Sequence, residues 1–287
     1  MEGEESMRSL IATFALVTAL LVPAAVEAFD EGKYPDWKGQ WRRAEPGPPR
    51  YDTGRPLLEQ QAPLTEKYKL AHAASLADQA AGGQGNDPTY TCIAPGMPRI
   101  MNVYDPMEIV ITPDTTHFLI QHVHDSRRVF TDGRDWPDQP DNIEPTFSGY
   151  SIGRWIDSDG DGRYDLLEVE TRLVRGPRVF DATGLPLHED NQTIVKERIY
   201  ADKSNPDTIV NEIVTIDNAL TRPWSATKRY RRVAGQGAVW PESVCAEGNG
   251  HVEIGGQNYF LSADGYLMPA RKDQPPPDLK YFSRPQK

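Results

Sequence analysis

Short runs of β-branched and aromatic residues that alternate with polar residues dominate the chain between residues 107 and 233. Such alternation is typical of strands with one buried face, and turn residues separate the runs. Because the turns are short, we expect a mainly antiparallel sheet. About eight or nine strands in one domain predict a mainly β fold, an antiparallel β-barrel, with a β-sandwich as the alternative. The expected strands lie near residues 107–112, 116–124, 127–131, 149–156, 165–173, 193–201, 208–216 and 224–233, with a weaker one near 257–261.

The residues before the strands have a different composition. Residues 29–62 are rich in Pro, Gly, Trp and Arg, which predicts an extended arm on the surface. Residues 64–80 contain few helix breakers and many good helix formers, which predicts one helix. The expected organisation is a signal peptide (1–28), an arm with the helix (29–90), a barrel domain (91–269) and a Pro-rich tail (270–287).

The first 28 residues have the pattern of a signal peptide. Arg8 supplies a positive charge, Ile11 to Val22 is almost wholly apolar, and small residues precede Phe29, the expected cleavage point. The apolar run is shorter than the roughly 20 residues that span a bilayer, although an N-terminal anchor is the alternative. We therefore predict a periplasmic or secreted protein without stable membrane insertion after cleavage.

Charge and cysteine content narrow the function classes. The net charge is −11 and no basic stripe is visible, which argues against a nucleic-acid partner. Cys92 and Cys245 are the two cysteines. In an oxidising compartment they predict one disulfide, which stabilises the fold by about 4–5 kcal/mol in the chain-entropy model; two free thiols are the alternative.

The segment from residue 157 to residue 168 has the spacing of a calcium-binding loop. Carboxylates stand at its first, third, fifth, ninth and twelfth positions, and a glycine at its sixth. The glycine allows the bend that turns the seventh carbonyl inward, and the last carboxylate can bind the ion through both oxygens. We expect a structural calcium site that joins two strands; an Asp/Gly-rich turn without an ion is the alternative. The predicted ligands are Asp157, Asp159, Asp161, Arg163, Asp165 and Glu168.

Two glutamates are the first candidates for catalysis. If Ala201 pairs with Thr208 in a hairpin, Glu197 faces Glu212 among aliphatic side chains. Two opposed carboxylates share a proton, which suits general acid–base chemistry. Alternatively, nearby arginines neutralise the pair, or a register slip of one residue separates it.

Histidines and tryptophans supply the remaining candidates. His122 and His124 point to one face of their strand, so with a third ligand they could hold a transition metal; a pair of hydrogen-bonded or surface histidines is the alternative. No nucleophile elbow, phosphate loop or dinucleotide fingerprint is present. The residues expected to contact a ligand are Trp155, Trp224, Arg134 and His188.

Several short motifs resemble known families. Residues 39–41, Gly-Gln-Trp, resemble the first-strand signature of lipocalins. The runs Arg-Arg-Val-Phe-Thr-Asp-Gly-Arg at 127–134 and Ser-Ile-Gly-Arg-Trp at 151–155 are similar to a family of uncharacterised exported bacterial proteins. Glu-Arg at 197–198, Thr-Ile-Asp at 215–217 and Pro-Trp at 223–224 extend that resemblance, which implies a lipocalin-like β-barrel and no reaction.

Three functions remain open at this level. The first is a calcium-stabilised barrel that binds a small, partly apolar molecule inside it. The second is a hydrolase, lyase or isomerase, either cofactor-free or metal-dependent, that uses the two glutamates with the two histidines. The third is a structural or interaction protein in which calcium and the disulfide provide rigidity.

Overall fold

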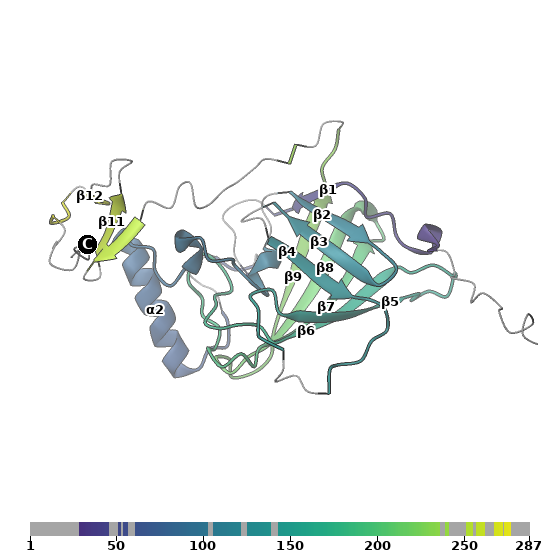
Figure 1. Ribbon diagram of the computed structural model, residues 1–287, viewed down its shortest axis with the longest axis horizontal. Helices are drawn as coiled ribbons and strands as arrows, with labels where there is room; N and C mark the ends of the chain where they lie inside the picture. Colours follow the sequence, from purple (N-terminus) through teal and green to yellow (C-terminus); the bar gives the residue numbers. More distant parts are fainter. Residues whose placement is uncertain are drawn as a thin grey trace, which may run out of the picture. The chain divides into compact units, whose positions relative to one another are not determined.

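Nine strands, β1 to β9, follow one another in chain order around a closed barrel (Figure 1). The computed structural model describes residues 29–45, 51–52, 54–56, 61–102, 106–121, 125–138, 143–235, 239–240, 251–254, 257–261, 267–271 and 273–276. The mainly β fold with a barrel and one α-helix is therefore confirmed. The strands of the barrel are β1 (Gln40–Arg43), β2 (Met107–Ile111), β3 (Thr115–Ile120), β4 (Asp125–Phe130), β5 (Tyr150–Ile156), β6 (Leu166–Arg172), β7 (Ile194–Asp202), β8 (Asn205–Ile216) and β9 (Trp224–Arg232).

The strand that closes the barrel comes from the segment predicted to be an arm. β1 pairs with β9 on one side and with β2 on the other, so this part of the arm belongs to the wall. The expected strand near 257–261 instead belongs to a second sheet of three strands. The strands of that sheet are β10 (His251–Ile254), β11 (Gln257–Leu261) and β12 (Leu267–Pro269).

One pair of neighbouring strands in the barrel is not antiparallel as expected. β4 and β5 run parallel and are paired through only two residue pairs, Val129 with Ser151 and Phe130 with Ile152. A parallel pair needs a long connection, and residues 131–149 provide it. Three residues of this connection, Arg134, Asp135 and Trp136, border the pocket described below.

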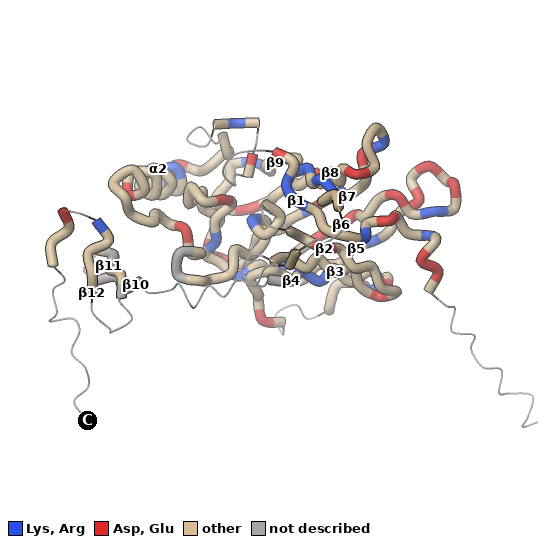
Figure 2. The backbone as a smooth tube through the Cα atoms, turned by 90° about the horizontal axis from the view of Figure 1, so that it is seen from above, with Lys and Arg blue, Asp and Glu red and all other residues tan. Residues whose placement is uncertain are grey.

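Alternation along the strands separates an inner from an outer face. In β9, Trp224, Ala226, Lys228 and Tyr230 are buried, while the residues between them are exposed. The core therefore lies inside the barrel. Figure 2 shows that charges of both signs are interspersed along the chain around the barrel.

Aromatic clusters occupy both ends of the barrel. At the end near the β5–β6 loop, Trp155 packs against Trp37 and Tyr34, with ring centroids 5.0 and 5.5 Å apart. At the other end, Trp224 packs against Tyr51 and Phe180 at 4.4 and 5.1 Å.

The predicted helix is α2, Glu66–Ala80, preceded by Thr65. His72 and Ser75 on its buried side form hydrogen bonds with Thr183, through Nε2 at 3.0 Å and Oγ at 2.9 Å. The described residues also form three short 3-10 helices, η1 (Glu31–Lys33), η3 (Pro88–Thr91) and η4 (Arg99–Met101). None of the helices in the described part of the chain is long and apolar enough to cross a membrane.

Candidate functional site

The loop between β5 and β6 holds its first carboxylate with backbone hydrogen bonds. Asp157 Oδ1 accepts from the amides of Gly160 and Asp161 at 2.7 and 3.2 Å, and Oδ2 accepts from Gly162 at 2.9 Å. Gly160 and Gly162 have φ angles of 78° and 88°, a region that non-glycine residues rarely adopt. The glycine at the sixth position therefore makes the bend that the sequence predicted.

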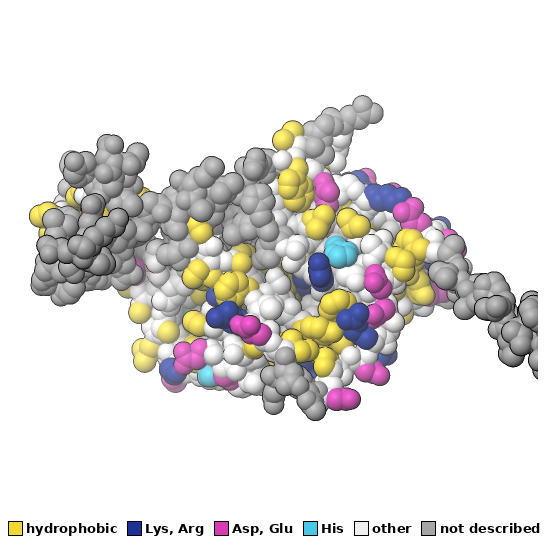
Figure 3. Space-filling view, viewed as in Figure 1, with side chains coloured by type: hydrophobic (Ala, Val, Ile, Leu, Met, Phe, Trp, Pro, Cys, Tyr) yellow, Lys and Arg dark blue, Asp and Glu magenta, His cyan; other side chains and the backbone are white. Residues whose placement is uncertain are grey.

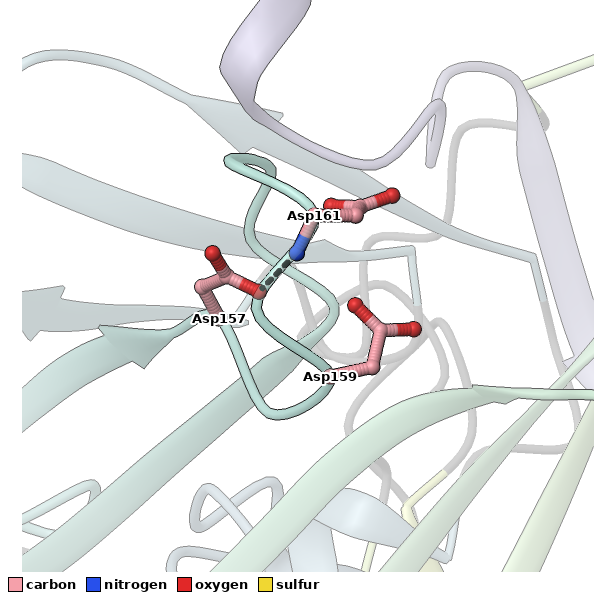
Figure 4. A group of neighbouring side chains, drawn as sticks. All are labelled: Asp157, Asp159 and Asp161. Carbon is pink, nitrogen blue, oxygen red and sulfur yellow. Dashed lines mark hydrogen bonds between the residues drawn. The ribbon is translucent and has the colours of Figure 1, made fainter.

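Three of the expected calcium ligands lie together. Oxygen atoms of Asp157, Asp159 and Asp161 are all within 4.8 Å of one another, around the turn of the loop (Figure 4). The amide of Arg163 donates to Asp161 Oδ1 at 2.8 Å. Three clustered carboxylates on a tight loop fit a hard cation such as calcium, which prefers oxygen ligands.

The other two predicted carboxylate ligands lie apart from this cluster. Asp165 accepts hydrogen bonds from the amide and hydroxyl of Ser158, at 2.8 and 2.5 Å. Glu168 lies within β6 on the outer face, with Oε1 3.4 Å from Nε of Arg198. Glu168, the predicted last ligand, is therefore not part of the cluster of Asp157, Asp159 and Asp161 in this structure, and its role as a ligand stays a prediction.

The predicted pairing of Glu197 with Glu212 is also wrong. Ala201 pairs with Ile209, and a bulge between Ala201 and Asp202 shifts the register by one residue from the one expected. Since side chains alternate between faces, this shift places Glu197 inside the barrel and Glu212 outside. The two carboxylates therefore do not form an acid–base pair.

Glu197 instead forms a fully buried ion pair with Arg127 of β4. Arg127 donates to both carboxylate oxygens, with Nη1 3.0 Å from Oε1, and both side chains are 0% exposed. Asn211 donates to Oε1 at 2.8 Å, and Arg127 also donates to Thr171 at 2.9 Å. Both carboxylate oxygens of Glu197 are engaged by Arg127 and Asn211 in a buried site, so this network is better suited to holding the barrel together than to proton transfer.

A second buried cation lies on β9. Lys228 is 1% exposed and donates a hydrogen bond to the backbone carbonyl of Tyr51. Its Nζ lies 5.1 Å from the centroid of the Tyr51 ring. Burial lowers the pKa of Lys228 to about 7, while the nearby charge of Asp181 opposes this shift. Such a group titrates near neutral pH although it is enclosed.

The two tryptophans predicted to contact a ligand, Trp155 and Trp224, do not converge. His122 and His124 lie outside the described residues. Trp155 and Trp224 belong to aromatic clusters at opposite ends of the barrel. His188 is placed in a loop, with Nδ1 3.0 Å from Asp190.

The proposed disulfide and signal peptide remain predictions. Cys92 ends η3 with a φ of 60°, whereas Cys245 lies outside the described residues. Residues 1–28 also lie outside them.

A pocket of about 490 Å³ lies on the outer wall over β5 to β8. Its volume is in the range of small-molecule sites, about 300–1,000 Å³. In the space-filling view, hydrophobic side chains are exposed among charged ones on the face of the barrel turned to the viewer (Figure 3). We call this pocket the outer groove; it is lined by Arg134, Asp135, Trp136, Ile152, Gly153, Arg154, Glu168, Val169, Glu170, Lys196, Glu197, Arg198, Glu212 and Val214.

Strand register arranges the outward side chains of the groove in two rows. The first row crosses the strands with an apolar residue at each end and reads Ile152, Glu170, Lys196, Val214. The second row alternates in charge and reads Arg154, Glu168, Arg198, Glu212. The groove therefore offers apolar contact beside fixed charges, which is the usual composition of a site for a small amphipathic molecule.

The loop after β4 supplies the rim of the groove. Arg134 is the predicted ligand-binding residue that the structure does place there. Its guanidinium stacks 3.8 Å from the Phe130 ring centroid and bonds to Asp132. Trp136 lies beside it, with the Arg172 guanidinium 4.2 Å from its ring centroid. These contacts hold the rim in place.

Comparison with known proteins does not assign a role to this site. No protein-family model, no curated protein and no solved structure matches the chain. The resemblance to exported lipocalin-like proteins therefore stays a prediction.

Three charged residues of consequence were not among the predicted site residues: Arg127, Lys228 and Arg154. A signal for two of them was present. Lys228 occupies an inner position in the alternation of β9, and Arg127 does so in β4. A charge at an inner position of a strand predicts a buried partner.

Proposed function

We propose that the protein is an exported, calcium-stabilised β-barrel that binds a small, partly apolar molecule in the outer groove. The observation that carries this proposal is the groove itself, a pocket of small-molecule size with apolar residues beside charges. The ligand was expected inside the barrel, where the inner side chains instead form the core and the Arg127–Glu197 network. We therefore assign binding to the outer wall.

Binding is tested with 2-naphthalenemethanol, a neutral molecule with an apolar body, by isothermal titration calorimetry. Val214→Asp places a carboxylate against that body. Burying part of a charge costs about 1–3 kcal/mol, so we expect at least about ten-fold weaker binding. Ile216→Asp is the matched control, because Ile216 lies on the same strand and face but outside the groove.

The control separates site binding from adhesion to apolar surface. Ile216→Asp should change the affinity less than two-fold. If neither variant changes the affinity, or if both weaken it equally, the molecule does not occupy the groove.

Calcium is proposed at the β5–β6 loop, with Asp157, Asp159 and Asp161 as ligands. The support is the motif spacing together with the clustering of these three carboxylates. Their number leaves coordination positions to the loop carbonyls and water, which is usual for weak extracellular sites. In millimolar calcium such a site would be filled.

Asp159→Asn tests the calcium site without disturbing the loop. No hydrogen bond to the Asp159 carboxylate is found within the described residues, so the substitution removes charge alone. Calcium at about a hundred times the dissociation constant should stabilise the wild-type protein by about 2–3 kcal/mol against chelator, measured by thermal unfolding. The variant should lose most of this gain, and Asp138→Asn, an exposed aspartate outside the loop, should keep it. Equal gains in all three proteins would contradict the proposal.

A further inference from the structure

We infer that the ligand of the outer groove carries a negatively charged group that pairs with Arg154. This inference rests on the proposed function, because it names the chemical class of the molecule that the groove binds. It comes from the pattern of ion pairs among the charged residues that line the groove.

Arg154 lies on β5 and projects from the outer face of the wall. Its neighbour across the β5–β6 pairing is Glu168. The Glu168 carboxylate is engaged on its other side, where Oε1 is 3.4 Å from Nε of Arg198. The second row therefore begins with Arg154, and the carboxylate of its cross-strand neighbour, Glu168, already contacts Arg198.

The other basic residues of the groove already have carboxylate partners. Lys196 Nζ is 3.2 Å from Glu170 Oε2, and Arg134 Nη2 is 2.6 Å from Asp132 Oδ2. Arg198 also contacts a second carboxylate, with Nη1 3.3 Å from Glu212 Oε2.

Arg154 is the exception among these cations. Within the described part of the chain, it forms no ion pair at 4.0 Å or less. It is exposed, so water satisfies its donors until a ligand replaces that water. Its planar fork is suited to a carboxylate, sulfonate or phosphate group, which it can bind through two parallel hydrogen bonds.

The carboxylates of the groove are less suited to a cationic ligand. Glu212 accepts from Tyr200 at 3.0 Å in addition to Arg198. Asp135 has no ion pair with a described residue, but it lies in the rim segment outside regular secondary structure. Arg154, by contrast, is fixed on a strand two residues from Ile152, so an anion at Arg154 leaves the rest of the molecule beside the first row of the groove, which begins at Ile152.

The acidity of the whole protein does not oppose this preference. The net charge is −11, but charges beyond about 8 Å are largely screened at physiological ionic strength. The local arrangement of the groove therefore decides the sign of the ligand.

Three naphthalene probes that share one apolar body test the inference: 2-naphthoate, 2-naphthalenemethanol and 2-naphthylmethylammonium. At pH 7 in titration calorimetry we expect the carboxylate to bind about five-fold more tightly than the alcohol, as for a partly exposed charge pair, and the ammonium more weakly than both. Arg154→Gln should remove the preference for the carboxylate, so that this variant binds 2-naphthoate no more tightly than 2-naphthalenemethanol. Arg128→Gln, an exposed arginine on β4 outside the groove, should retain the preference.

The outcomes separate this inference from the proposed function. Equal affinity for all three probes, or tighter binding of the ammonium, overturns the anionic ligand and leaves the groove as a binding site. A preference for the carboxylate that survives Arg154→Gln overturns the assignment to Arg154. Failure of all three probes to bind overturns the groove itself and the inference with it.

Discussion

Replacing Glu197 with leucine is expected to lower the free energy of unfolding by about 3–5 kcal/mol, because it leaves the Arg127 guanidinium buried without its counter-charge. Urea-induced unfolding followed by circular dichroism measures the change. Glu212→Leu is the matched control. It removes a glutamate from the next strand, but its side chain is 42% exposed, and its loss should cost less than about 1 kcal/mol.

A double variant distinguishes the cost of leaving Arg127 without its partner from the cost of removing the whole Arg127–Glu197 ion pair. Arg127→Met with Glu197→Leu removes both charges, and apolar residues of similar size often replace a buried ion pair at little cost. We therefore expect the double variant to be more stable than Glu197→Leu alone. If it is less stable than that single variant, the uncompensated arginine is not the source of the destabilisation.

The second large effect concerns pH and Lys228. Its pKa is lowered from 10.5 to about 7 by burial in the folded protein. Above pH 7 the unfolded chain therefore binds more protons at this lysine than the folded protein does. The contribution to stability rises with pH from the folded pKa toward the unfolded one, and is level below the folded pKa.

Between pH 7 and pH 9 this rise amounts to about 2–3 kcal/mol. Lys228→Met should abolish it, so the difference in unfolding free energy between wild type and variant should change by that amount over this interval. Lys196→Met, at an exposed outer position, should show the same pH dependence as wild type. A Lys228→Met profile parallel to wild type would contradict the lowered pKa.

The barrel could be predicted from the sequence because alternation is clear in most of its strands. β9 alternates without interruption between buried and exposed positions, and the helix α2 begins within two residues of the expected place. Alternation did not reveal the closing strand β1, because four residues in a segment rich in Pro and Gly carry no periodic signal of their own. The resemblance of residues 39–41 to the first-strand signature of lipocalins did point to a strand there.

The register of the β7–β8 hairpin could not be predicted, and the physical reason is specific. β8 is apolar on both faces, since Ile209 and Ile213 point inward while Val210 and Val214 lie beside them on the other face. Alternation therefore fits two registers equally well. The bulge at Ala201 selects one of them, and bulges have no strong signature in a single sequence. The clustering of Asp157, Asp159 and Asp161 was predicted more fully because their spacing is local in the chain.

Two strand pairings of the barrel, β1–β2 and β4–β5, are short, and they lie on either side of three strands that we call the panel. β2, β3 and β4 form an antiparallel meander, which meets β1 through two residue pairs and β5 through two more. Within the described strands, few backbone hydrogen bonds therefore resist sideways opening of this meander, and we expect local unfolding of the wall to begin there. Arg127 lies on β4 of the meander, and Glu197 lies on β7, three strands further around the wall. Their ion pair thus crosses the barrel and couples the panel to the rest of the protein, so that opening the panel exposes two charges at once.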